Sequence, residues 1–432
     1  MSRSSYAPNL YTAHTPSTVD DSEILQVETL SSDTFAFPST LAQRISQWWK
    51  KDDALTGRVT CSVPFTSTDG RAFLAVACAE GVWIGFRHDP RTLRRVLHLK
   101  MVTQCAALEE FGILLVLANK SLFAYDLEAL VPSSPQSAKR SHPPQKLSQS
   151  NEVQFFRIGR LEGQPIVVYA KKKGSNSVFR VLEPTVDKIR EGGMTPAALS
   201  SRLGQLQSRS KWFRVIRDFL LPSEAYDVIF LGTRIAIPCK NGFEIVELSN
   251  FRCLTVPRCD DPRQKKLAKR CRSCHPMGMF HSRKDEFLLC YDKFGLYVDA
   301  RGEPVPTRDI IEWGCTAEHV AWYPPYVLIF SSRSIEVRHV GTGRLCHIIR
   351  GHGLQCTWDG FQSFGAPLVS EPDGIWGKTP AEGAHVHGVM LVDDESQERS
   401  GLSRTVGGVA HRVFELVPTI PTSRFEEPWT PP

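Results

Sequence analysis

Four cysteines near the middle of the sequence have the residue type, and part of the spacing, that a zinc site needs. The segment from 253 to 281 contains Cys253, Cys259, Cys271, Cys274, His275 and His281. Structural zinc takes four sulfur or nitrogen ligands, usually as pairs about two to four residues apart, and Cys271 and Cys274 form such a pair. Cys253 and Cys259, with five residues between them, exceed that spacing. We therefore interpret the thiols as incidental, with zinc bound by all four cysteines as the alternative.

Other motifs resemble binding sites but lack an essential residue or context. The sequence CRSCH, from Cys271 to His275, has the spacing of c-type haem attachment, but that attachment follows export and no export signal is present. DGIWGKT (373–379) ends like a phosphate-binding loop, yet Pro372 stands where the first glycine is required. No nucleophile elbow or zinc-protease motif occurs. We expect no cofactor and no enzymatic activity; a catalytic site assembled from distant residues is the alternative.

A strip of basic residues overlaps the cysteine-rich segment. Positions 258–272 hold seven basic and two acidic residues, a local charge of 7 − 2 = +5. The basic residues are Arg258, Arg263, Lys265, Lys266, Lys269, Arg270 and Arg272. Such a cluster attracts anionic phospholipids or acidic proteins, whereas its lack of aromatic residues argues against nucleic-acid binding by base stacking. A solvated loop or short helix is the simpler interpretation. Recruitment to a membrane surface through this strip, helped by Trp48 and Trp49, is the alternative.

Repeated β-hairpins are the elements that must position these residues. Each repeat has a strand-like apolar run, a short polar or glycine-containing turn and a second strand-like run. The copies lie at 73–86, 113–127, 165–182, 234–248, 287–302 and 326–340, with a weaker seventh formed by 387–392 and 409–416. Further strand-like runs lie between copies, at 102–108, 153–158, 212–219 and 317–323. Four strands per repeat, at periods of roughly 40 to 50 residues, predict an all-β, seven-bladed β-propeller with inserted loops and one or two short helices.

The sequence before residue 58 does not show this repeat. Residues 1–23 are rich in Ser, Thr, Tyr and Pro without periodicity, which favours a flexible tail. Within residues 41–51, one face of a short amphipathic helix is predicted to hold Leu41, Ile45, Trp48 and Trp49. We expect an N-terminal tail at 1–57, the propeller at 58–418 and a C-terminal tail at 419–432.

The composition favours a folded cytosolic protein. Of 432 residues, 41% are hydrophobic and 23% charged, which is enough apolar surface for a core, and the net charge is only 52 − 46 = +6. No run approaches the about 20 apolar residues of a membrane-spanning helix, and the first fifteen residues lack the apolar part of a secretion signal. Twelve cysteines are too few for a disulfide scaffold.

Several of these segments resemble the citron homology (CNH) domain, in the version found at the C-terminus of fungal Rho guanine-nucleotide exchange factors. The similar segments, in the same order, are 58–65, 80–130, 155–184, 221–248, 286–302, 323–343 and 413–418, so that the resemblance covers most of the chain. It implies a seven-bladed propeller that acts as a protein-interaction module. It also implies partners among Rho-family small GTPases and their regulators.

The resemblance does not extend to the catalytic part of those exchange factors. They carry a helical Dbl-homology domain before the propeller, and 57 residues precede Arg58 in this sequence. We therefore expect a non-catalytic CNH module in Rho-type signalling, either stand-alone or a truncated relative of an exchange factor. We expect it in the cytoplasm, recruited to the cell cortex.

Overall fold

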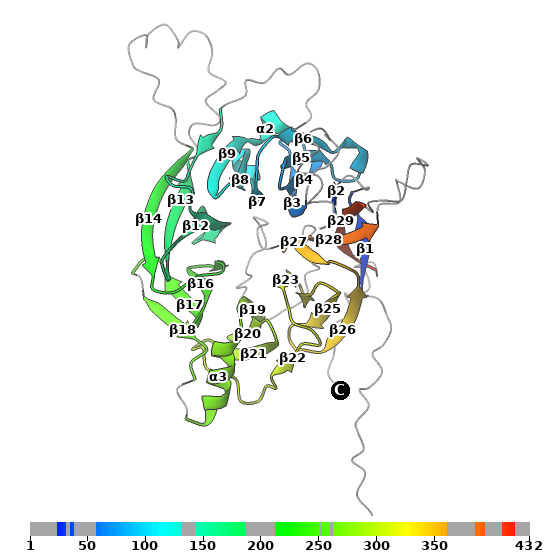
Figure 1. Ribbon diagram of the computed structural model, residues 1–432. Helices are drawn as coiled ribbons and strands as arrows, with labels where there is room; N and C mark the ends of the chain where they lie inside the picture. Colours follow the sequence, from blue (N-terminus) through cyan, green and yellow to red (C-terminus); the bar gives the residue numbers. More distant parts are fainter. Residues whose placement is uncertain are drawn as a thin grey trace, which may run out of the picture.

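Seven antiparallel β-sheets stand side by side in a ring, which confirms the predicted seven-bladed propeller (Figure 1). The computed structural model describes residues 24–31, 35–38, 58–131, 143–185, 212–250, 252–259, 262–360, 385–393 and 408–419. Successive blades contact one another near the centre of the ring, through their inner strands or, between blades 4 and 5, through β16 and β19, and the inner strand of the last blade contacts that of the first. The ring is therefore closed.

The first six blades each contain four consecutive strands, and the first strand of each is the innermost. Blades 1 and 2 are formed by β3 (Val59–Thr66), β4 (Ala72–Cys78), β5 (Gly81–Phe86), β6 (Arg94–Leu97), β7 (Val102–Leu108), β8 (Ile113–Ala118), β9 (Ser121–Asp126) and β10 (Gln145–Lys146). Blades 3 and 4 are formed by β11 (Val153–Leu161), β12 (Gln164–Lys173), β13 (Asn176–Pro184), β14 (Phe213–Leu221), β15 (Ile229–Leu231), β16 (Arg234–Cys239), β17 (Gly242–Glu247) and β18 (Cys253–Val256). Blades 5 and 6 are formed by β19 (Pro276–Arg283), β20 (Glu286–Tyr291), β21 (Phe294–Asp299), β22 (Ile311–Glu312), β23 (His319–Tyr323), β24 (Tyr326–Phe330), β25 (Ser334–His339) and β26 (Leu345–Arg350).

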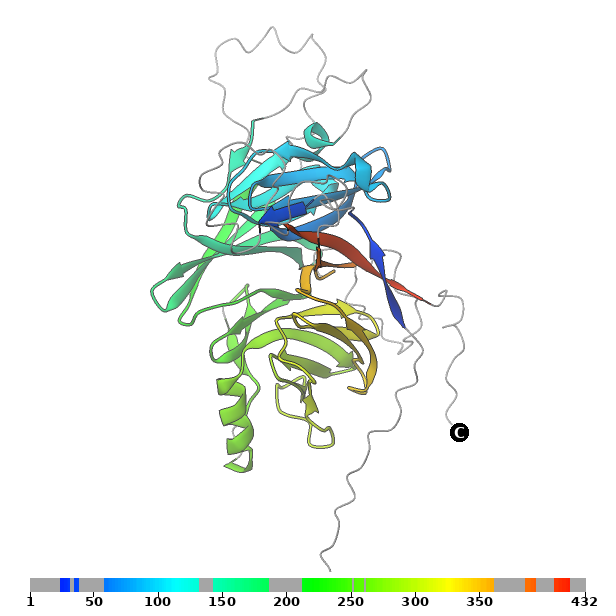
Figure 2. The ribbon, with the colours of Figure 1, turned by 45° about the vertical axis from the view of Figure 1, so that its right-hand side comes forward.

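The seventh blade combines the two ends of the described chain. Its strands are β27 (Gln355–Trp358), β28 (Val386–Asp393), β29 (Gly408–Pro418), β1 (Leu25–Thr29) and β2 (Phe35–Pro38). Strands β1 and β2 both pair with β29, and Figure 2 shows β1 in blue beside β29 in red. The expected tail at 1–57 is corrected here, because Leu25–Thr29 is part of the propeller. Leu25 is buried between blades 6 and 7, which explains why this short strand is held in place.

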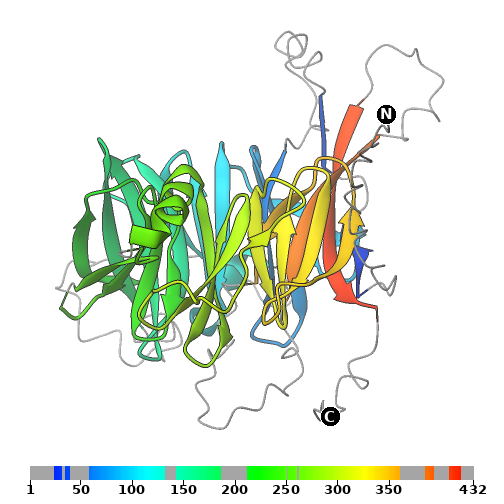
Figure 3. The same ribbon diagram turned by 90° about the horizontal axis from the view of Figure 1, so that it is seen from below.

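The hairpins form where the apolar runs and turns predicted them. Between β8 and β9, for example, Asn119 and Lys120 have positive φ angles of 47° and 56°. Two such residues match the right-handed twist of the strands they join, as in a type I′ turn. Figure 3 shows the ring from its edge, with the strands running from one face to the other and the turns at the two faces.

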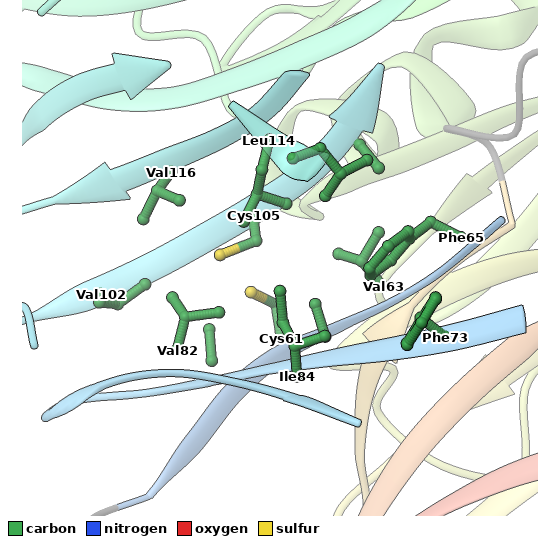
Figure 4. Packing of buried hydrophobic residues seen from close by; sticks show 14 of the residues in the cluster. Cys61, Val63, Phe65, Phe73, Val82, Ile84, Val102, Cys105, Leu114 and Val116 are labelled. Carbon is green, nitrogen blue, oxygen red and sulfur yellow. The ribbon is translucent and has the colours of Figure 1, made fainter. Parts of the chain in front are cut away.

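The core is divided among the seven interfaces between blades. Each interface contains one cluster of buried hydrophobic side chains, contributed by the two adjacent sheets. In the cluster between blades 1 and 2, Cys61 of β3 points toward Cys105 of β7 (Figure 4). Val63 of β3 and Leu114 of β8 belong to the same cluster. All six residues of β8 are buried, because each face of this sheet is covered by a neighbouring blade.

Helices are few in the described residues. The two α-helices are α2 (Leu127–Leu130) and α3 (Lys265–Ser273), and short 3₁₀ turns occur at Pro90–Thr92, Glu109–Phe111 and Pro262–Gln264. No helix in the described ranges is long and apolar enough to span a membrane. The helix expected at 41–51 lies outside the described residues.

Replacing Leu25 tests whether β1 belongs to the propeller. Leu25→Ala removes buried methyl groups and should lower the free energy of unfolding by about 2–5 kcal/mol. Glu28→Ala, at an exposed position of the same strand, should change it by less than about 0.5 kcal/mol. Urea unfolding measures both variants, and an unchanged midpoint for Leu25→Ala would show that β1 does not stabilise the ring.

Candidate functional site

An ion-pair network joins strands from opposite parts of the ring near its centre. Arg157 on β11 of blade 3 donates two hydrogen bonds to Asp227, which precedes β15 of blade 4, at 2.6 and 2.7 Å. Its third nitrogen, Nη1, lies 3.0 Å from Oδ2 of Asp359, which follows β27 of blade 7. Since blades 3 and 7 are not neighbours, this arginine connects two sheets that share no hydrophobic interface.

The electrostatics of this network favour the charged forms of its two basic members, Arg157 and His319. Burial opposes the charge on Arg157, but the carboxylates of Asp227 and Asp359 raise the pKa of the guanidinium further above its usual range. His319 on β23 of blade 6 lies 3.7 Å from the same Asp359 carboxylate. Burial also opposes a charge on His319, but Cys356 and Asp359 raise the pKa of its imidazole to about 10. The network therefore holds charged groups from blades 3, 4, 6 and 7 in contact.

A second buried polar cluster lies where blade 7 meets blade 1. Arg87, at the end of β5, donates a 2.5 Å hydrogen bond to Glu415 on β29. The Nδ1 atom of His385 lies 2.5 Å from the same Glu415 oxygen. Burial would raise the pKa of Glu415, but the hydrogen bonds from His385 and Arg87 lower it to about 2. This ion pair connects the first blade to the last.

Two buried histidines of blade 7 complete this contact with blade 1. His387 on β28 lies 3.2 Å from the hydroxyl of Ser62 on β3, and that hydroxyl is 2.7 Å from Thr357 on β27. His411 on β29 accepts a hydrogen bond from the backbone N–H of Val59 at 3.2 Å. Burial lowers the pKa of His387 to about 3 and that of His411 to about 4, so both imidazoles are neutral at physiological pH.

The structure does not bring the four cysteines of the zinc alternative together. Cys253 on β18 donates its thiol proton to Glu244 at 2.9 Å, and burial together with this carboxylate raises its pKa to about 12. Cys271 is buried on the inner side of α3, while Cys259 and Cys274 are half-buried. In the described part of the chain, no three His, Cys, Asp or Glu side chains are grouped as a metal ion would require.

The basic strip forms a 3₁₀ turn followed by α3, at the outer edge of blades 4 and 5. Leu267, Cys271 and Cys274 face the hydrophobic cluster between these blades. Arg270 is turned toward the protein, donating two hydrogen bonds to Glu312 at 2.5 and 2.6 Å. The side chains that remain exposed are Arg258, Arg263, Lys265, Lys266, Lys269 and Arg272. Trp48 and Trp49, expected to assist this strip, lie outside the described residues.

The outer strand of blade 3 is a further exposed feature, which the sequence analysis did not single out as a site. Strand β14 has nine residues, and its other edge has no paired strand in the described ranges. Val215, Ile216 and Leu220 are 51%, 48% and 56% exposed, whereas natural outer strands are usually short or charged. Its charged side chains instead contact the protein, since Arg214 pairs with Glu183 and Asp218 with Arg180. The only indication of this surface in the sequence was the apolar residues of the strand, FRVIRDFLL.

Comparison with known proteins identifies similar sequences. A model of the CNH domain matches residues 70–360. Rho1 guanine nucleotide exchange factor 1 of Schizosaccharomyces pombe is 26% identical, over 74% of this chain and 24% of its own length. Rho1 guanine nucleotide exchange factor 2 of that yeast is 30% identical, over 70% of this chain and 25% of its own. RHO1 GDP-GTP exchange protein 2 of Saccharomyces cerevisiae is 27% identical, over 66% of this chain and 21% of its own length. The chain thus spans about a quarter of the length of these relatives.

A solved structure agrees with the fold. The AfRom2 CNH domain superposes on 91% of this chain and 99% of its own, with a TM-score of 0.62 and 23% sequence identity. At this identity the likeness supports the propeller architecture and carries no information on individual residues.

Removing the central arginine should destabilise the ring. Arg157→Met removes the cation that Asp227 and Asp359 share in a largely buried place and should lower the free energy of unfolding by about 3–5 kcal/mol. The matched control is Arg160→Met on the same strand, whose exposed pair with Glu110 should contribute less than about 1 kcal/mol. Equal losses for the two variants in urea unfolding would contradict a structural role for the network.

The two buried histidines make stability depend on pH. Unfolding raises their pKa values from about 3 and 4 to about 6.5, so the unfolded chain binds more protons and acid favours it. Each histidine should remove about 2 kcal/mol of stability between about pH 7 and about pH 5. Protonation of Glu415 also lowers stability in acid, but only at lower pH, because its pKa is lowered. The raised pKa of His319 gives stability that is fully present below about pH 6.5, so His319 does not offset the loss caused by the two buried histidines there.

Chemical denaturation across this pH range measures the effect. His387→Gln should reduce the slope of stability against pH by about 1 kcal/mol per unit, averaged over this range, whatever its effect on absolute stability. The exposed His98→Gln should leave the slope unchanged. A slope that His387→Gln does not alter would mean that this imidazole is protonated in the folded protein.

Proposed function

The chain belongs to the CNH domain family, and from this we propose that it is a non-catalytic protein-interaction module in Rho-type small GTPase signalling. The match of its propeller to Rho1 exchange factors of two yeasts carries the proposal. The closed ring suits this task, because the stacked blades hold the loops and outer strands rigid while their sequences vary. A module of this kind would act in the cytoplasm at the cell cortex.

We propose no catalytic step for the described residues. The charged side chains with strongly shifted pKa values are paired, as Arg157 is with Asp227 and Asp359, and Glu415 with Arg87. The buried His387 and His411 instead contact the Ser62 hydroxyl and the Val59 backbone N–H. These side chains are placed to connect blades, since each network joins different sheets. We therefore propose that the described propeller does not itself catalyse nucleotide exchange.

The partner, a Rho-family GTPase or one of its regulators, is proposed to contact the outer strand of blade 3. An unpaired edge offers backbone N–H and C=O groups to an added strand, and alternate side chains give specificity. On β14 these groups accompany three exposed apolar side chains. Opposite Val181 and Leu182, strand β14 contains a β-bulge in which Ile216 has no cross-strand partner. Ile216 therefore interrupts the regular pairing of β13 with β14.

Capture by nucleotide-loaded Rho GTPases tests the proposal. The immobilised chain should retain a Rho-family GTPase above the level of an unrelated propeller, without accelerating the release of bound nucleotide. Retention of no GTPase in either nucleotide state would refute Rho binding. Accelerated release would refute the non-catalytic assignment.

The contact surface is tested separately with paired variants. Ile216→Asp with Leu220→Asp places charges on β14 and should weaken capture at least about tenfold, because such charges disrupt a buried apolar contact. Leu254→Asp with Ile348→Asp makes the same change on the outer strands β18 and β26 and should leave capture within about twofold. The reverse pattern would place the contact at blades 4 and 6.

A further inference from the structure

The geometry of α3 points to a docking surface for an anionic phospholipid membrane. We name Lys265, Lys266, Lys269 and Arg272 the cationic face. At about 100° per residue these side chains fall within an arc of about 120°, opposite the side of α3 that packs on blades 4 and 5. All four are exposed, and none takes part in an ion pair with another described residue. The cationic face is therefore available to a partner.

The position of α3 suits a flat partner. Figures 1 and 2 show the helix at the outer edge of the ring, away from the centre where the inner strands meet. Its inner side is fixed by Leu267 and Cys271 in the hydrophobic cluster of blades 4 and 5, so the exposed side cannot turn inward. A convex edge of this kind can approach a planar surface without rearrangement of the propeller.

The residue types favour lipid headgroups over an acidic protein. Three of the four members of the cationic face are lysines, which act as hydrated point charges on flexible stems and suit a diffuse layer of negative charge. Arginine, whose planar fork recognises individual carboxylates, is used at Arg270 for an internal pair with Glu312. No large apolar side chain lies within the cationic face to form the centre of a protein interface.

The local energetics of α3 supply an independent argument. Lys265 and Lys266 occupy the first turn, where the helix dipole is positive, and no residue of that turn is acidic. The N-cap residue Gln264 makes no side-chain capping hydrogen bond. This arrangement opposes helix stability, and such conflicts between local preference and structure are characteristic of functional sites. An anionic surface against the first turn would relieve the repulsion.

Vesicle sedimentation of the full chain tests the inference without any GTPase, so that its outcome is independent of the proposed Rho contact. The chain should sediment with vesicles of phosphatidylcholine and phosphatidylserine, and not with phosphatidylcholine alone. Sedimentation should decrease as salt rises, because charges near the surface are screened. Absence of sedimentation with the anionic vesicles would overturn the inference.

Neutralising variants locate the contact. Replacing Lys265, Lys266, Lys269 and Arg272 by Gln should weaken partition at least about tenfold, since each cation near the surface contributes. The matched control removes the same charge elsewhere, by Gln at the exposed Arg94, Lys100, Lys240 and Lys284, and should stay within about twofold. Equal losses in the two variants would overturn the inference in favour of general attraction by net charge.

Two further experiments separate charge from lysine identity, and a membrane from an acidic protein. Replacing the three lysines of the cationic face by Arg retains the charge and should retain binding, and circular dichroism should show that every variant is folded. A soluble poly-glutamate peptide provides the acidic-protein arm. Binding of the peptide through the cationic face, without sedimentation on anionic vesicles, would overturn the membrane assignment and identify an acidic protein as the partner.

Discussion

Closure of the ring between blades 7 and 1 is the contact on which the other six interfaces depend. Every blade of this propeller hides its apolar faces against two neighbours. Without closure, blade 7 would expose Val389 and Val413, and blade 1 would expose Val76. Two unpaired apolar sheets of that size would be open to aggregation. The pairing of β1 with β29 and the contacts of His387 and His411 with blade 1 prevent this.

The polar networks fix the alignment of the blades, which an apolar core alone would determine less strictly. Hydrophobic clusters tolerate small sliding movements between sheets, whereas a hydrogen bond is satisfied over a narrow range of distance and angle. Arg157 therefore fixes the relative heights of blades 3, 4 and 7 in the ring, and Glu415 does so for blades 1 and 7. Because the partners are charged and buried, misaligned blades would leave uncompensated charges.

The repeated architecture was predictable because its signal is local. Each hairpin, such as the one at 113–127, contains its own strands and turn within about fifteen residues, so the pattern can be recognised without knowledge of the fold. Strand β1 was missed because it has five residues and its partner lies almost 400 residues away. LQVET does alternate apolar and polar residues, but five residues with no hairpin partner nearby are too short a run to stand out from the polar segment around them.

The candidate sites were predictable only in part for the same reason. The basic strip was visible as a sequence cluster, but the inward direction of Arg270 depends on Glu312, which is 42 residues away. The central network joins residues separated by 70 and about 200 positions, and isolated arginines and aspartates carry no signal of such a contact. The cysteine cluster illustrates the converse point, because residues close in sequence need not share a site. Cys253 lies on β18 and bonds to Glu244, whereas Cys271 lies on α3.

The arrangement of blade 7 determines how the propeller would respond to mechanical force. Leu25 pairs with Pro418, and the N–H of Thr419 donates to the carbonyl of Ile24 at 3.1 Å, so both chain exits lie at the same end of the β1 and β29 pair. Tension between the flanking segments would load the hydrogen bonds of this pair one after another. A pair loaded in this way peels apart at lower force than one sheared along its length. The propeller thus holds Ile24 and Thr419 close together, and would yield first at β1 when these two points are pulled apart.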